Sequence, residues 1–206
     1  MALHISTFDG RGSSTIEDPE EISDYVAGSS CLVWIDVTDA STADFEEIAK
    51  ELELHPLALE DARKHRQRPK IETYPTHAFV VAYSRDLAEV DCFIGPNWVV
   101  TVCGRGNSGE PFPIETVRQR FERIRGDVPS VAALLYVLLD DIVDGYFAAA
   151  DVFEDEVEDF EQCILGEENA RGDGRAIQRD LVRLRRELVE FRRRVIPLRD
   201  VLAVIV

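Results

Sequence analysis

Two adjacent carboxylates, Glu60 and Asp61, stand on a short predicted helix and could bind a hard cation. Mg²⁺ takes oxygen ligands and keeps several of its waters, so one or two carboxylates can suffice. A simpler interpretation is a solvated acidic turn that pairs with Arg63, Lys64 or Arg68. Composition alone favours this simpler interpretation.

A second acidic group, Asp140, Asp141 and Asp144, lies in a longer run of helical spacing. Asp140 and Asp144 are one turn apart, so a helix places both carboxylates on one face. In an acidic chain, a solvated helix face explains the same pattern, and the spacing alone predicts no metal site.

The segment Gly104–Gly109 matches the pattern GxGxxG directly after a strand-like run. A dinucleotide site also needs a helix that starts at the loop, so that its N-terminus meets the pyrophosphate. Here Glu110–Pro113 intervenes, which favours an exposed loop. No metalloprotease spacing of histidines and no nucleophile–base arrangement is present, so we expect a protein that is not an enzyme.

Composition limits the partners of this 206-residue chain, which is 45% apolar and carries a formal net charge of −17. That field repels nucleic acid and anionic membrane surfaces and attracts cations. It also fits a protein that stays soluble in strong brine. The four cysteines form no CxxC pair and indicate a reducing compartment. Neither a signal peptide nor a membrane span is evident, so we expect this segment to be soluble.

Residues 1–125 are predicted to form a mixed α/β domain. Strand-like runs occur at Leu32–Asp36, Lys70–Tyr74, Ala78–Tyr83, Val90–Ile94 and Trp98–Cys103. Helical spacing predicts helices over Phe45–Leu52, Leu57–Lys64 and Ile114–Ile124. The turn signal Gly95–Asn97 predicts a hairpin between the last two strands.

Residues 130–206 are predicted to form two long antiparallel helices joined by a turn at Gly166–Gly174. The first carries twelve acids and no bases from Asp140 to Glu168, and the second carries nine arginines from Arg175 to Arg199. Opposite charge favours a hairpin, but exposed ion pairs contribute little, so apolar contacts must hold it together. The apolar pattern still runs at Val206, which suggests a fragment.

The predicted core draws on both parts of the chain. Its members are Val33, Ile35, Phe79, Val81, Phe93, Val100, Val102, Leu135, Leu138, Ile142, Leu184 and Leu188.

The segment His55–Asp61, followed by Gln67–Lys70 and the apolar run Ala78–Tyr83, resembles the cytoplasmic domain of the CorA family of divalent-cation channels. The family pattern is HPLxxED, a short spacer, QRPK and a strand. Segments later in the chain, Leu138–Tyr146 and Leu181–Glu190, resemble the family's long helix and stalk. The resemblance covers nearly the whole chain, with its elements in the same order.

The resemblance implies an α/β fold in which a mixed sheet flanked by helices leads into a helical hairpin, the start of a stalk. It also implies a homopentamer at the cytoplasmic face of the cell membrane, anchored only through C-terminal helices that this sequence lacks. In the family, Mg²⁺ bound between cytoplasmic domains holds the pore shut, and its carboxylates match Asp61, Glu60 and Asp140. A further family aspartate lies beyond Val206. The expected ligand is therefore Mg²⁺, or another divalent cation such as Co²⁺, and nucleic acid is not expected.

Two other functions stay open. One is a Zn²⁺-transporting relative in the same superfamily, although the few histidines and unpaired cysteines do not favour it. The other is a free-standing module that binds a partner through its helical hairpin. Transported ion, strand order and assembly of this segment are not fixed by the sequence.

Overall fold

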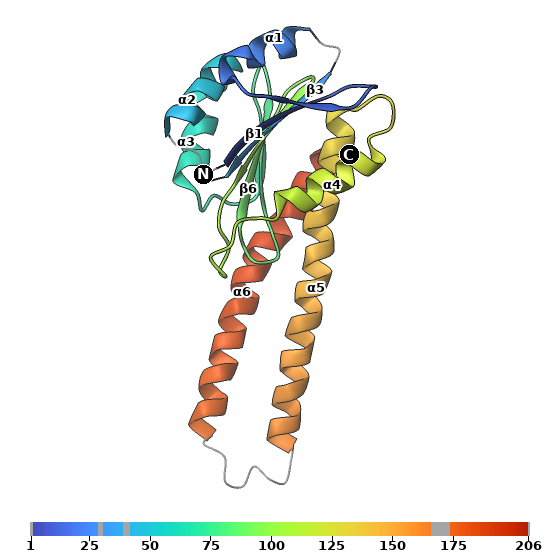
Figure 1. Cartoon of the computed structure of the whole chain (residues 1–206). Coiled ribbons are helices and arrows are strands. Elements are labelled where there is room, and N and C mark those ends of the chain that lie inside the picture. Colours follow the sequence, from blue (N-terminus) through green and yellow to red (C-terminus); the bar gives the residue numbers. More distant parts are fainter. Residues whose placement is uncertain (1, 29–30, 39–41, 166–173, 206) are drawn as a thin grey trace.

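A seven-stranded mixed sheet forms the centre of the molecule. The computed structural model describes residues 2–28, 31–38, 42–165 and 174–205 (Figure 1). The strands are β1 (Ala2–Phe8), β2 (Ser13–Ile16), β3 (Leu32–Thr38), β4 (Lys70–Thr73), β5 (Ala78–Tyr83), β6 (Glu89–Ile94) and β7 (Trp98–Cys103). Their order is β2-β1-β3-β7-β6-β5-β4, and only β3 and β7 pair in parallel.

Helices cover both faces of this sheet (Figure 1). They are the 3₁₀ turn η1 (Pro19–Glu21), α1 (Ile22–Ala27), α2 (Thr42–Glu51), α3 (Pro56–Lys64), α4 (Ile114–Ile124), α5 (Val131–Leu165) and α6 (Gly174–Ile205). Helices α1 to α3 pack on one face, and α4 with parts of α5 and α6 packs on the other. The central strands are therefore buried on both sides, which explains their nearly continuous apolar sequences.

Alternation along β3 assigns its side chains to the two cores. Val33 and Ile35 lie in the core under α1 to α3, whereas Trp34 lies in the core under α4 to α6. Trp34 makes an edge contact with Phe121 of α4, with ring centroids 6.3 Å apart. A strand with apolar residues at successive positions thus holds two helical layers together.

Local signals position α3 and the β6–β7 hairpin. His55 precedes α3 and its Nδ1 accepts a hydrogen bond of 3.3 Å from the backbone N–H of Leu57, while Pro56 occupies the first turn. Gly95 follows β6, at a place where a Cβ atom would lie 2.0 Å from the Trp98 ring, so only glycine fits there. Both features agree with the turn signals in the sequence.

Below the sheet, α5 and α6 extend side by side as a long arm (Figure 1). Phe191 of α6 contacts Tyr146 and Phe153 of α5, with ring centroids 5.6 and 5.5 Å apart. Leu184 is buried farther along α6, at 3% exposure. The charges on the two helices also meet, since Arg183 lies 3.3 Å from Glu156.

The expected fold class is confirmed, and the five predicted strands are present as β3 to β7. The predicted helices are present as α2 to α6. The sequence analysis assigned no elements to β1, β2, η1 and α1. The predicted turn at Gly166–Gly174 falls almost wholly outside the described residues.

Two core assignments need correction. Leu188 is 37% exposed although it lies one turn from the buried Leu184 on the same face of α6, because the two-helix arm covers that face unevenly. Val102, near the end of β7, is only partly buried against the core. The other predicted core residues are buried.

Candidate functional site

Asp61 projects from α3 toward the edge strand β4. Its Oδ2 accepts a hydrogen bond of 2.6 Å from Nζ of Lys70, and the same ammonium donates to Glu72 Oε1 at 2.8 Å. Burial opposes the charge on Lys70, but the two carboxylates outweigh it and raise its pKa. The hydrogen bond from Lys70 lowers the pKa of Glu72. One cation is thus held between two carboxylates at the edge of the sheet.

Glu60, the neighbour of Asp61, forms an ion pair with Lys64 one turn later on α3. Both side chains are more than half exposed, so water screens this pair. The simpler interpretation of the Glu60 carboxylate, pairing with a nearby base, is therefore present in the structure.

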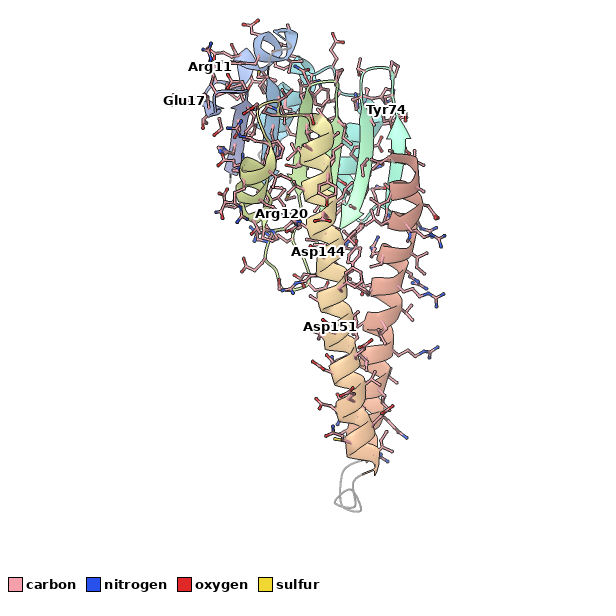
Figure 2. The ribbon with its side chains drawn as sticks, turned by 90° about the vertical axis from the view of Figure 1, so that its right-hand side faces the viewer. Arg11, Glu17, Tyr74, Arg120, Asp144 and Asp151 are labelled. Carbon is pink, nitrogen blue, oxygen red and sulfur yellow. The ribbon has the colours of Figure 1, made fainter. Side chains whose placement is uncertain are left out.

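Asp140 lies on α5 where α4 crosses it, and it forms an ion pair with Arg120 of α4. The same guanidinium lies 3.8 Å from Asp144 (Figure 2). Burial raises the pKa of Asp141, while Arg120 partly counters this effect. Arg120 therefore neutralises part of the acidic group that the sequence analysis identified.

Within one chain the sheet separates the predicted site residues. Glu60 and Asp61 are on α3, in the layer over one face. Asp140 is on α5, in the layer over the other face. The structure therefore brings Glu60 and Asp61 together, but not Asp140.

Beside Asp140, an apolar groove of about 770 Å³ opens between α5 and the end of α6. Its walls include Leu135, Tyr136, Leu139, Val143, Leu202 and Ile205. Tyr136 is 61% exposed. A carboxylate at the border of an exposed apolar surface is typical of protein interfaces, where charge surrounds an apolar centre.

The glycine loop after β7 has no free cradle for a phosphate. The backbone N–H of Ser108 and its hydroxyl both donate to the Asp86 carboxylate, and the Asn107 N–H donates to the Asp86 carbonyl. The N–H groups of Gly104, Gly106 and Gly109 donate to other carbonyls of this region. Helix α4 begins only at Ile114, so the nucleotide interpretation has no structural support.

The sequence analysis missed three acidic residues inside strands. Asp36 is 4% exposed and accepts a hydrogen bond of 3.1 Å from the Thr101 hydroxyl. Glu89 and Asp91 of β6 are 5% and 0% exposed. An acid inside an apolar strand, as in Trp-Ile-Asp-Val and Val-Asp-Cys-Phe, was the signal available in the sequence.

Burial raises the pKa of Asp36 to about 6, although Thr101 and Arg118 favour its charged form. Burial, together with the negative charges of Glu89 and Asp61, raises the pKa of Asp91 well above its usual range. These two carboxyls differ from Asp61 and Asp140, which have basic partners in direct contact.

In the described ranges, none of the helices is both long enough and apolar enough to cross a membrane.

Comparison with known proteins identifies relatives by sequence. The family model described as "CorA-like Mg2+ transporter protein" matches residues 29–206. The cobalt/magnesium transport protein CorA of Thermotoga maritima is 32% identical over 189 residues, which cover 85% of this chain and 51% of that protein. A putative metal ion transporter of Bacillus subtilis is 28% identical, over 82% of this chain and 52% of that protein. The chain thus spans about half the length of these relatives.

Solved structures show the same fold. The soluble domain of CorA from Methanocaldococcus jannaschii superposes with a TM-score of 0.71 at 20% identity, over 97% of this chain and 77% of that one. A ZntB cytoplasmic domain from Vibrio parahaemolyticus gives a TM-score of 0.64 at 11% identity, over 94% of this chain and 75% of that one.

Proposed function

The chain belongs to the family of CorA-like Mg²⁺ transporter proteins, and on this premise we propose that it is the metal-sensing part of a divalent-cation channel. In this proposal, copies of the chain form a ring at the cytoplasmic face of the membrane. Mg²⁺ binds between neighbouring copies and favours the closed pore. The observation that carries the proposal is the position of the family-matched carboxylates on opposite sides of the sheet.

This position favours a ring. Asp61 and Asp140 of one chain are separated by the sheet, so they can share an ion only if Asp61 of one copy faces Asp140 of the next. Such a contact joins two different surfaces, and contacts of this kind generate closed rings when the rotation closes. The family resemblance gives five as the number of copies.

Exposed apolar residues on the arm support self-association. Leu181 and Leu188 on α6 are exposed and seven residues apart, and so are Val182, Val189 and Ile196. A seven-residue apolar repeat is typical of a helix that packs against other helices. The groove beside Asp140 adds a second apolar surface of the kind that a neighbouring copy would cover.

Mg²⁺ must compete with the basic side chains that already pair with these carboxylates. Lys70 and Arg120 neutralise Asp61 and Asp140 in the single chain. When two acidic copies approach, their repulsion opposes assembly, and a dication between them turns repulsion into attraction. A site with a dissociation constant near 1 mM, at about 10 mM Mg²⁺, shifts the equilibrium by roughly 1.4 kcal/mol. Five coupled sites would therefore suffice for a switch.

Sedimentation velocity of this chain with and without Mg²⁺ tests the proposal. We expect Mg²⁺ to shift the wild-type chain toward a larger species, and Asp61→Asn and Asp140→Asn to require several-fold more Mg²⁺ for the same shift. Asp151→Asn is the matched control, since it removes one exposed carboxylate from α5 farther along the arm (Figure 2). Identical Mg²⁺ responses in all four proteins would contradict binding at these carboxylates.

The fold alone does not select the transported ion, because both the CorA soluble domain and the ZntB cytoplasmic domain share it. The 32% identity to a cobalt/magnesium transport protein favours Mg²⁺ and Co²⁺. Ion flux through the full-length protein distinguishes these ions from Zn²⁺.

A further inference from the structure

Asp91 is a buried carboxylate without a hydrogen-bonding partner. It lies on β6, where it pairs with Val81 of β5 on one side and with Val102 of β7 on the other. Its side chain is on the sheet face covered by α2 and α3. Its side chain is 0% exposed, and neither carboxylate oxygen has a hydrogen-bond partner among the described residues. Buried polar groups in proteins are almost always partnered, so Asp91 requires an explanation.

Glu89, two residues earlier on the same face, has the opposite environment. Its carboxylate accepts hydrogen bonds from the Tyr83 hydroxyl at 2.6 Å and from the backbone N–H groups of Gln67, at 3.3 Å, and Arg66. These three donors hold the Glu89 carboxylate in place beside Asp91.

His65 completes the cluster from the end of α3. Its backbone has φ +50°, and Arg66 follows with φ +64°. Two successive non-glycine residues with positive φ are uncommon. Backbone strain of this kind concentrates at functional sites. One ligand atom from each of His65, Glu89 and Asp91 lies within 4.8 Å of the others.

A proton does not fully account for this arrangement. Burial and the nearby carboxylates raise the pKa of Asp91, so a neutral carboxylic acid removes the cost of the charge. The neutral group still has an O–H donor and a carbonyl acceptor. Since neither Asp91 oxygen has a partner, protonation leaves these groups unsatisfied. A cation contacts the oxygen lone pairs directly and cancels the charge at the same time.

We propose that His65, Glu89 and Asp91 form a binding site for a first-row transition-metal dication within each protomer. One imidazole nitrogen and two carboxylates suit ions such as Co²⁺ and Zn²⁺ better than Mg²⁺, which takes oxygen ligands. Metal–ligand distances of about 2.0–2.2 Å need ligand atoms roughly 3–4 Å apart, so small side-chain rotations close the site. The site lies within one chain and does not depend on the proposed Mg²⁺ interface.

An ion can reach the site through a cavity of about 1030 Å³. His65 and Glu89 line this cavity, together with Arg63, Arg66, Arg105 and Arg194. Three of these arginines have contacts elsewhere: Arg63 lies 3.3 Å from Glu46, Arg105 donates to the Gly109 carbonyl at 2.9 Å, and Arg194 donates to the Gln67 carbonyl at 2.8 Å.

The same contacts connect the site to α6. The Arg194 guanidinium lies over the Tyr83 ring at 4.4 Å and donates to its hydroxyl at 3.1 Å, while that hydroxyl donates to Glu89. An ion on Glu89 competes for the lone pairs that Tyr83 uses. The position of α6 against the sheet therefore depends on the occupancy of the site.

Titration of the chain with Co²⁺ alone, followed by visible absorption, tests the site. We expect one Co²⁺ per chain with the absorption of a nitrogen-ligated ion, displaced by Zn²⁺ and not by an equal concentration of Mg²⁺. His65→Ala and Asp91→Asn should each weaken Co²⁺ binding at least tenfold. His65 is exposed, so His65→Ala keeps the test valid if Asp91→Asn fails to fold.

His4→Ala is the matched control, because it removes a histidine from β1 outside the cluster. Its Co²⁺ affinity should equal that of the wild type. Absence of Co²⁺ binding at 1 mM ion, about the weak end of protein metal sites, would overturn the proposal. Equal affinities of the wild type and His65→Ala would also overturn it.

Discussion

The environment of each carboxylate sets its chemistry in this chain. Asp61 and Asp140 are partly exposed and hold basic partners, so they are accessible to a competing cation. Asp36 and Asp91 are buried, at 4% and 0% exposure. Aspartate, which occurs throughout this acidic sequence, thus has several roles, and each role depends on burial and on the nearest hydrogen-bond donor.

Asp36 makes stability depend on pH. Its pKa is about 6 in the folded chain, raised by burial from its ordinary value of 3.8, so the folded state binds a proton that the unfolded state has lost. Stability from this group is complete below pH 3.8 and declines as the pH rises through 6. Thr101, Cys103, Arg118 and Glu115 surround the carboxyl and affect its pKa.

Asp36→Asn should therefore stabilise the chain at pH 7.5 relative to pH 4. We expect the difference in unfolding free energy between variant and wild type to change by about 2–3 kcal/mol between these pH values. Urea unfolding at both pH values measures it. The same difference at pH 4 and pH 7.5 would show that Asp36 does not titrate as described.

At the residue scale, the sequence predicted candidate ligands but not their partners. Lys70 as the partner of Asp61 depends on β4 lying beside α3, and Arg120 as the partner of Asp140 depends on α4 crossing α5. Both are contacts between separate elements. Local spacing identified only the pair within one helix, Glu60 with Lys64.

At the scale of elements, α6 has one apolar face that is buried unevenly. Leu184 and Leu198 are buried at 3% and 1% exposure, whereas Leu181 and Leu188, on the same face, are 39% and 37% exposed. The sequence analysis placed both Leu184 and Leu188 in the core. Periodicity identifies the face but not which of its residues a neighbouring element covers.

Leu184→Ala and Leu188→Ala, one turn apart on the same face of α6, compare a buried leucine with an exposed one. Leu184→Ala removes buried contacts and should lower the unfolding free energy by about 2–3 kcal/mol at any protein concentration. Leu188→Ala should change monomer stability by less than about 1 kcal/mol and weaken self-association. Thermal unfolding and sedimentation, each over a range of concentrations, measure the two effects. Equal effects on monomer stability would contradict the difference in burial between the two leucines.

Some strands could be predicted from their own sequence, and others could not. The central strands β5 and β7 have the predicted boundaries, since burial on both faces requires a continuous apolar sequence. The edge strand β2, Ser13–Ile16, has three exposed residues of four. It is a strand because β1 pairs with it, and such pairing is not visible in its own composition.

At the scale of the whole molecule, one sheet separates the helix that carries Asp61 from the helix that carries Asp140, and a helical arm extends from the sheet (Figure 1). A surplus of 40 acidic over 23 basic residues opposes assembly of several copies. In the proposed ring, divalent cations and the exposed apolar residues of α6 offset this repulsion, and the ion concentration would then control assembly.

The central claim is that ions shared by Asp61 and a neighbour's Asp140 control the pore. Mg²⁺ uptake by vesicles that contain the full-length protein tests it most directly, with the wild type compared with the double variant Asp61→Asn, Asp140→Asn. We predict that Mg²⁺ on the side of this domain stops uptake by the wild type, while the double variant continues at the same concentration. Equal inhibition of both proteins, or no uptake by the wild type at any Mg²⁺ concentration, would contradict the account.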